Sequence, residues 1–205
     1  MSSQPALRRN SRANLERILD EMLVRPDAHD ALAAEMDRDF AEVRTVMVLD
    51  MSGFSRTTQQ CGIAAFLLMI HRMKRLACPI VLANGGVVVK AEADDLYCLF
   101  ESPLEAIAAS REIIAEMNQA NPHFREDRRL YASIGIGHGP ILNLDEDDIF
   151  GDEVNLASKL GEDVAESGTV LLTDSARAEA AKAGIATREE AISISGLELR
   201  YHVLV

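Results

Sequence analysis

The spacing of hydrophobic residues changes several times along the chain, and the change near residue 45 marks the most informative segment. Residues 45–49 form a short, largely apolar run with β-branched members, which is typical of a buried strand. Asp50 follows directly, and Gly53 lies in a short loop before the next helical pattern. This stretch predicts a strand, a carboxylate at its end, and a loop that leads into a helix.

Helical spacing, with apolar residues three and four positions apart, recurs on both sides of this strand. Before it, residues 6–23 have the pattern of an amphipathic helix, Pro26 breaks it, and the pattern resumes over 28–43. We interpret residues 1–42 as a short helical N-terminal extension and residues 43–205 as one domain. The extension is expected to pack on this domain or on a second copy of it, and the sequence gives no support for a regulatory role.

The remaining patterns predict a chain of alternating elements. The first elements are a helix (59–78, with Pro79 kinking or ending it), a turn (84–86), two hairpin strands (87–91 and 96–101) and a helix with a capping box at Ser102 (to about 119). A strand (130–137), a turn (137–139), a further strand (140–143) and an acidic loop (144–152) follow. The last elements are a helix (153–166), a strand (168–173), a helix (174–183) and a closing strand (199–204). This βαββαβ order with C-terminal additions resembles a ferredoxin-like core, an α/β (α+β) fold in which an antiparallel sheet carries helices on one face.

Composition places the chain among ordinary globular proteins and narrows its partners. The 205 residues are 48% hydrophobic and 26% charged, with a net charge of −12. An acidic protein repels nucleic acids and anionic membranes, so we expect neither as a partner. The sequence has no run of membrane-spanning length and no signal peptide, so we expect a cytoplasmic location. Three single cysteines match no zinc pattern and are interpreted as free thiols.

Two acidic positions are candidate metal ligands. The predicted topology puts the 87–101 hairpin next to the 45–49 strand, so that Asp94 would stand beside Asp50 at one end of the sheet. Two carboxylates that hold two divalent ions are a recurring arrangement for attack at phosphorus. Both residues also have purely structural interpretations, because Asp50 would serve as a helix cap and the Asp94–Asp95 pair is a turn signal.

Further polar positions require an explanation. Lys90 lies inside an apolar strand and needs a partner or access to solvent. Asp148 lies in an acidic loop, but the spacing is wrong for a calcium-binding EF-hand, because position six from Asp145 is Phe150 rather than Gly. Asn155 and Lys159 are four residues apart and share one helix face, which is either solvated surface or a contact for a sugar oxygen and a phosphate.

In order and spacing, these segments resemble the motifs of the class III nucleotidyl cyclases, the adenylate and guanylate cyclase catalytic domain. The family's D-[IV]-x-G-F segment corresponds to residues 50–54 (DMSGF), and its K-x-x-G-D hairpin to 90–94 (KAEAD). Its S-I-G-I-x-x-G strand corresponds to 133–139 (SIGIGHG), and its D-x-[WF]-G-x-x-V-N-x-A-S-R segment to 148–159 (DIFGDEVNLASK). The resemblance covers about residues 43–205.

The resemblance implies a role for each matching residue. Asp50 and Asp94 would bind two Mg²⁺ or Mn²⁺ ions, with the Met51 carbonyl as a further ligand. Gly53 and Phe54 would contact the substrate.

Four more residues would act on the nucleotide. Lys90 and Asp148, the base-recognition pair, would contact the base. Adenine suits them, because its N6 amine donates to a carboxylate and its N1 accepts from an ammonium, whereas guanine inverts both demands. Asn155 would orient the ribose, and Lys159 would stabilise charge on the transferring phosphoryl group.

The implied reaction is attack of the ATP 3′-oxygen on the α-phosphorus, which gives 3′,5′-cyclic AMP and pyrophosphate. Family architecture implies a homodimer in which the metal carboxylates of one protomer face the base and ribose residues of the other. Lys90 and Asp94 would then serve different active sites, and a monomer would be nearly inactive.

Three positions depart from the family pattern. Lys159 replaces an Arg and lacks its bidentate fork. Ala93 replaces the hairpin Gly, and residues 194–197 lack the cation often found there, although Arg200 is nearby. These departures motivate an alternative, a catalytically weak or inactive cyclase-like dimer that binds nucleotide or metal in a regulatory role. A guanylate cyclase is a further alternative.

Overall fold

The computed structural model describes residues 9–51, 54–145, 147–194 and 197–205. Its strands are β1 (Ala41–Met51), β2 (Val87–Glu92), β3 (Asp95–Phe100), β4 (Ala132–Leu144), β5 (Asp148–Phe150), β6 (Val170–Leu172), β7 (Thr187–Ile194) and β8 (Leu197–Leu204). Its helices are α1 (Arg12–Val24), α2 (His29–Phe40), α3 (Phe54–Ala83), α4 (Pro103–Ala120), α5 (Asp152–Lys159) and α6 (Asp174–Lys182), with a π-helical turn, η4 (Leu160–Val164), after α5. Short 3₁₀ turns lie at Pro26–Ala28, Asn121–His123 and Glu126–Arg128.

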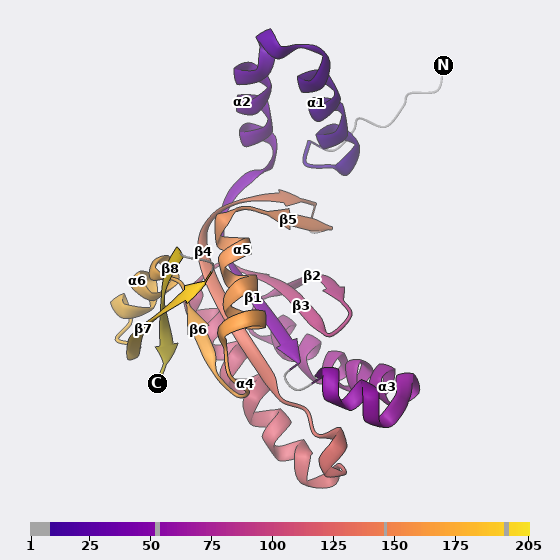
Figure 1. Ribbon diagram of the computed structural model, residues 1–205. Helices are drawn as coiled ribbons and strands as arrows, with labels where there is room; N and C mark the ends of the chain where they lie inside the picture. Colours follow the sequence, from indigo (N-terminus) through magenta and orange to yellow (C-terminus); the bar gives the residue numbers. More distant parts are fainter. Residues whose placement is uncertain (1–8, 52–53, 146, 195–196) are drawn as a thin grey trace.

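The described strands form one sheet with the order β2-β3-β1-β4-β6-β8-β7, and β5 pairs with β4 off this path (Figure 1). β1 is central and antiparallel to both β3 and β4. The expectation of a wholly antiparallel sheet is wrong for one pair, because β6 runs parallel to β4. A helix, α5, lies between these two strands in the chain, and such a crossover connection is what parallel pairing requires.

Alternate residues of β1 point to opposite faces of the sheet. Met47 and Leu49 join the larger core, which is formed with α3, α4 and α6. Val46 and Val48 face the other way and pack with Ala157 of α5. The expectation that all helices cover one face is therefore wrong, and Figure 1 shows α5 in front of the sheet. The α/β (α+β) fold class with its βαββαβ core is confirmed.

The turn predicted at residues 137–139 is absent, because β4 continues as one strand from Ala132 to Leu144. The glycines there serve close packing rather than a turn. A Cβ at Gly135 would lie 2.0 Å from the Ala157 carbonyl oxygen, and one at Gly137 would lie 2.6 Å from that of Glu153. Gly in this strand therefore allows the backbone of α5 to rest directly on the sheet.

Two strands were not predicted, and both lie where pairing is one-sided. β5 lies within the segment predicted as an acidic loop and pairs with β4 alone. β7 lies at the edge of the sheet and pairs with β8 alone. An edge strand needs no continuous apolar pattern, because much of its surface faces solvent. The sequences of β5 and β7 therefore lack the apolar pattern from which a strand is predicted.

The predicted helix at 59–78 is longer than expected and runs through Pro79 to Ala83. A proline inside a helix removes one hydrogen bond and costs about 3 kcal/mol. Burial of the next two side chains offsets that cost, because Ile80 and Val81 both lie in the main core. The helix also contains non-helical backbone at Gly62, with φ of +77°.

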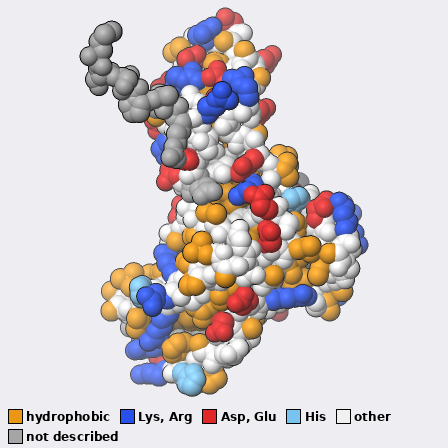
Figure 2. Space-filling view, turned by 180° about the vertical axis from the view of Figure 1, so that it is seen from behind, with side chains coloured by type: hydrophobic (Ala, Val, Ile, Leu, Met, Phe, Trp, Pro, Cys, Tyr) orange, Lys and Arg blue, Asp and Glu red, His pale blue; other side chains and the backbone are white. Residues whose placement is uncertain are grey.

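The N-terminal extension forms a helical hairpin of α1 and α2 that projects beyond the sheet (Figure 1). Its second helix ends at Phe40 rather than at residue 43, and β1 begins at the next residue. Ile18, Leu32 and Phe40 form a small core with Leu144 of β4. The expected packing of the extension on the domain is thus observed at the end of β4, and the domain boundary at residue 42 stays a prediction. Figure 2 shows this hairpin from behind, with acidic and basic side chains interspersed over it.

Candidate active site

The neighbouring strands β1 and β3 bring acidic residues together. In the β1–β3 register Leu49 pairs with Leu96, so Asp50 and Asp95 stand opposite each other one step further on. Their carboxyl groups interact, and each alters the pKa of the other. Both positions have the same side-chain direction as Val48 and Tyr97, so they lie on the α5 face of the sheet. Asp94 occupies the hairpin turn beside them and interacts electrostatically with Asp50, as the sequence predicted.

The hairpin turn contains the departure noted at position 93. Ala93 and Asp94 form a two-residue loop between β2 and β3, and Ala93 adopts a φ of +48°. A left-handed backbone costs a non-glycine residue roughly 1–2 kcal/mol. The turn that positions Asp94 therefore has the backbone conformation that a Gly at position 93 would adopt without strain, and Ala93 adopts the same conformation at a cost.

Asp50, Asp94 and Asp95 form one acidic group, and burial and repulsion raise the pKa values of two of its members, Asp50 and Asp95. Partial burial, followed by the charges of Asp94 and Glu162, raises the pKa of Asp50 to about 6. Partial burial, followed by the charges of Glu162, Asp50 and Asp94, raises the pKa of Asp95 to about 7. Carboxylates that repel one another in this way gain most when a cation binds between them.

Glu162 connects the acidic group to the end of α5. It lies on the π-helical turn, and its carboxylate accepts a hydrogen bond of 2.9 Å from the Tyr97 hydroxyl. The Tyr97 hydroxyl also lies 3.3 Å from the Ser158 hydroxyl. π-helical turns are rare and occur often at functional sites. No sequence motif marks Asp95 or Glu162 as a site residue.

Lys90 and Asp148, 58 residues apart in the chain, form an ion pair with 3.1 Å between Nζ and Oδ1. The Lys90 ammonium also lies 4.8 Å from the centroid of the Tyr97 ring. Partial burial raises the pKa of Asp148, but hydrogen bonds from Lys90 and from the Ile149 N–H lower it by more, so the carboxylate stays ionised. The structure thus brings the predicted base-recognition pair together as a donor beside an acceptor.

Asn155 and Lys159 lie on the outward side of α5, whose inner side is formed by Val154 and Ala157. Asn155 is exposed. The Lys159 ammonium donates to the Asp163 carboxylate at 2.9 Å, an i,i+4 pair. The two residues share a face, as predicted, and both are accessible to a molecule that approaches α5 from solvent.

The remaining predicted site residues have mixed outcomes. The Met51 side chain is buried in the main core, and its backbone N–H donates to the Asp50 carboxylate. Its role as a carbonyl ligand stays a prediction. Gly53 lies outside the described residues, and Phe54 begins α3 with a side chain that is also outside them.

The donor set of this group fits a hard divalent cation. Asp50, Asp94 and Asp95 offer carboxylate oxygens, and Asp95 Oδ1 is buried with no hydrogen-bond partner. Among the described residues no three acidic, His or Cys side chains converge on one point as a complete cage. Mg²⁺ is usually held by one or two carboxylates together with substrate phosphates, so this incomplete set is what a shared metal–nucleotide site needs.

We expect divalent cations to reverse the pH dependence that the acidic group creates. Both folded pKa values lie above the unfolded value of about 3.9, so the metal-free folded protein holds more protons between about pH 4 and 7. These groups therefore lower the free energy of unfolding as the pH rises through that window. Thermal melts should show wild type losing stability relative to Asp95→Asn from pH 5 to pH 8, with Mn²⁺ restoring wild type at pH 8. Parallel pH profiles for the two proteins would contradict this.

Comparison with solved structures identifies the fold. The catalytic core of a rhodopsin-guanylyl cyclase with converted specificity, in complex with ATPαS, superimposes with a TM-score of 0.68 at 18% identity, covering 80% of this chain and 98% of that one. The chain has the fold of a class III nucleotidyl cyclase domain. A non-canonical dimeric guanylyl cyclase domain of the RhoGC fusion protein from the aquatic fungus Blastocladiella emersonii gives a TM-score of 0.67 at 16% identity, covering 80% of this chain and 96% of that one.

A curated relative agrees with this cyclase fold. Residues of this chain are 29% identical over 129 positions to a protein of Rhizobium meliloti (strain 1021) named "Putative adenylate cyclase 3". The match covers 63% of this chain but 22% of that relative, so the chain spans only about a fifth of the relative's length. No family model matches the chain. The resemblance drawn from the four motifs is confirmed, and the neighbours include both adenylate and guanylate cyclases.

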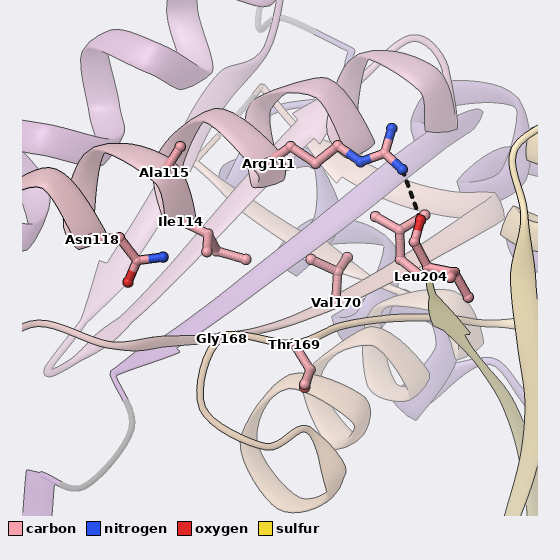
Figure 3. A pocket seen from close by; sticks show the side chains of 9 residues that line it. Arg111, Ile114, Ala115, Asn118, Gly168, Thr169, Val170 and Leu204 are labelled. Atoms are coloured by element: carbon pink, nitrogen blue, oxygen red, sulfur yellow. Dashed lines mark hydrogen bonds between the residues drawn. The ribbon is translucent and has the colours of Figure 1, made fainter.

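A pocket elsewhere in the chain is lined by none of the predicted site residues. It has a volume of about 350 Å³ and lies between α4, β6 and the end of β8. Ile114, Val170 and Leu204 line it, and Arg111 donates to the Val205 carbonyl oxygen at 3.2 Å (Figure 3). Because α4 covers the face opposite α5, this pocket is separate from the acidic group. No described helix is long and apolar enough to cross a membrane.

Proposed function

We propose that this domain is an adenylate cyclase that converts ATP into 3′,5′-cyclic AMP and pyrophosphate as a homodimer with two Mg²⁺ or Mn²⁺ ions. The observation that carries the proposal is the ion pair between Lys90 of β2 and Asp148 of β5, a donor and an acceptor 3.1 Å apart on strands that are not paired with each other. An adenine edge presents the complementary pattern, because N1 accepts from the ammonium and N6 donates to the carboxylate. Guanine presents an O6 acceptor where this pair offers an acceptor.

Asp50 and Asp94 would hold the cations, with Asp95 beside them as a further carboxylate. When bound, the ions would activate the 3′-oxygen and neutralise charge on the triphosphate. The 3′-oxygen forms a bond to the α-phosphorus, and the bond from that phosphorus to the oxygen that bridges it to the β-phosphorus breaks. Pyrophosphate leaves with the bridging oxygen, and the 3′-hydroxyl proton passes to solvent. The raised pKa values of Asp50 and Asp95 mean that the carboxylates must lose protons before they bind cations, which favours activity above about pH 7.

The outward face of α5 supports the dimer. Asn155 is exposed and Lys159 is only half-buried, and within the described residues of one chain their side chains form no hydrogen bond or ion pair with the base-recognition pair or the acidic group. A second copy that approached this face would bring its own acidic group to the ribose and phosphate residues. One of the structural neighbours is itself a dimer, although a non-canonical one. We infer that each active site takes residues from both protomers.

The test is a direct assay of the purified chain with ATP or GTP in the presence of Mn²⁺ or Mg²⁺. We expect cyclic AMP as the main product. Asp148→Asn, which replaces an acceptor by a group that also donates, should reduce the preference for ATP over GTP by about tenfold, the size of one lost base-specific hydrogen-bond pair. Asp37→Asn, an exposed carboxylate of α2, is the matched control and should change nothing. Preferential use of GTP by wild type would contradict adenine recognition.

A further inference from the structure

A guanidinium from the N-terminal extension reaches the base-recognition pair. Arg12, at the first position of α1, donates from Nη2 to Asp147 Oδ2 at 3.1 Å and from Nε to the same oxygen at 3.4 Å. The same Nη2 lies 3.5 Å from Asp148 Oδ2. No sequence pattern pointed to this contact, because 136 residues separate Arg12 from Asp148.

The two oxygens of Asp148 have different partners. Oδ1 accepts from the Ile149 N–H at 2.9 Å and pairs with Lys90 at 3.1 Å. Oδ2 has the looser contact with Arg12. The Asp148 side chain is 19% exposed and that of Arg12 is 54% exposed, so Arg12 lies on the solvent side of the carboxylate. A base that enters from solvent would meet Oδ2 and Arg12 together.

The extension is attached to the ribbon that carries Asp148. Leu144 pairs with Asp148 in the β4–β5 ladder, and Leu144 also belongs to the small core formed by Ile18, Leu32 and Phe40. The apolar contact and the Arg12 contact therefore hold α1 on one end of the same short ribbon. Arg12 is placed beside Asp148 by packing of the extension rather than by the ion pair alone.

We propose that Arg12 is a specificity-determining residue that opposes adenine and favours guanine at the base-recognition pair. The proposal rests on the function proposed above, in which Lys90 and Asp148 contact the base. Arginine offers donors only. The N6 amine of adenine is also a donor and must compete with Arg12 for Asp148 Oδ2, whereas O6 and N7 of guanine accept from a guanidinium. With the extension docked, the preference for ATP is therefore smaller than the Lys90–Asp148 pair alone would give.

The experiment compares wild type, Arg12→Ala and Arg25→Ala in the full chain. Arg25 lies in the same extension, is 58% exposed and has only a 3.8 Å ion pair with Glu21, so its loss removes the same charge without touching β5. Dissociation constants of α,β-methylene analogues of ATP and GTP are measured by calorimetry with Mn²⁺, and KM and kcat are measured with ATP and GTP.

For Arg12→Ala we expect the dissociation constant of the ATP analogue to fall about three- to fivefold and that of the GTP analogue to stay or rise. This is the range that an exposed ion pair supports. KM for ATP should fall in parallel, and kcat should change less than about twofold, because Arg12 contacts no predicted phosphate residue. Arg25→Ala should match wild type.

An unchanged ratio of the two dissociation constants in Arg12→Ala would overturn the inference, whether both constants stay the same or both fall by the same factor. Absence of binding to wild type and to Arg12→Ala would overturn it as well. A shifted ratio in proteins that form no cyclic nucleotide would leave the inference standing and would refute the proposed cyclase activity instead.

Discussion

Asp50→Asn is expected to abolish cyclic AMP formation while it raises the thermal stability of the metal-free protein. The activity should fall by about a thousandfold or more, because a carboxylate that holds a catalytic cation contributes several kcal/mol to transition-state stabilisation. The stability should rise, because burial and the charges of Asp94 and Glu162 disfavour the ionised Asp50 side chain, as its pKa of about 6 indicates. At pH 8 the gain should be about 2–4 °C in Tm, after allowance for the partial exposure of the group.

A loss of activity together with a gain in stability distinguishes a metal ligand at position 50 from a helix cap. Loss of a helix cap would lower both, since a cap contributes about 1 kcal/mol to stability. Cyclic AMP assays and thermal melts at pH 8, without metal and with Mn²⁺, measure the two quantities. Glu116→Gln, an exposed carboxylate of α4, is the control and should change neither. An Asp50→Asn protein that is less stable than wild type in the absence of metal would support the cap interpretation instead.

The sequence predicted the fold well where local patterns coincide with burial. The apolar run at 45–49 forms the centre of β1, and the capping box at Ser102 forms as expected, with the Glu105 carboxylate accepting from the Ser102 N–H. The predictions that failed concern features that depend on distant contacts. The pattern at Gly137 and Gly139 predicts a turn, although both lie in an extended strand and the close approach of the α5 backbone requires Gly at position 137.

The residues of the candidate site also fall into those that local motifs mark and those that only distant contacts bring to the site. Lys90, Asp94 and Asp148 could be identified because motif order marks them, and the fold brings Lys90 and Asp148 into contact. Asp95 was missed because its position opposite Asp50 depends on the β1–β3 register, which no local pattern specifies. Arg12 was missed for the same reason, since only the packing of the extension on Leu144 brings it to β5.

Lys159→Ala is expected to lower kcat by about a hundredfold, and Lys159→Arg to retain or raise it. Lys159 is paired with Asp163 at 2.9 Å, but this pair does not exclude a role on the phosphate. An exposed pair of this kind contributes about 0–1 kcal/mol, whereas a charge-stabilising donor in a transition state contributes roughly 2.7–4 kcal/mol. The ammonium can therefore leave Asp163 for the phosphoryl group at a small cost. An arginine would add a bidentate fork at the same position.

The choice of control makes this test specific to position 159. Lys182 of α6 forms the same kind of short-range pair, with Glu179 at 2.6 Å, and Lys182→Ala should leave kcat and KM unchanged. Asp163→Asn removes the competing carboxylate and should raise kcat by no more than about fivefold, the limit set by an exposed ion pair. Steady-state kinetics with ATP and Mn²⁺ distinguish these effects, because a phosphoryl contact made in the transition state lowers kcat more than it raises KM. Equal kcat values for Lys159→Ala and wild type would show that the transferring phosphoryl group is stabilised by a different cation, and Arg200 of β8 would then be the next residue to substitute.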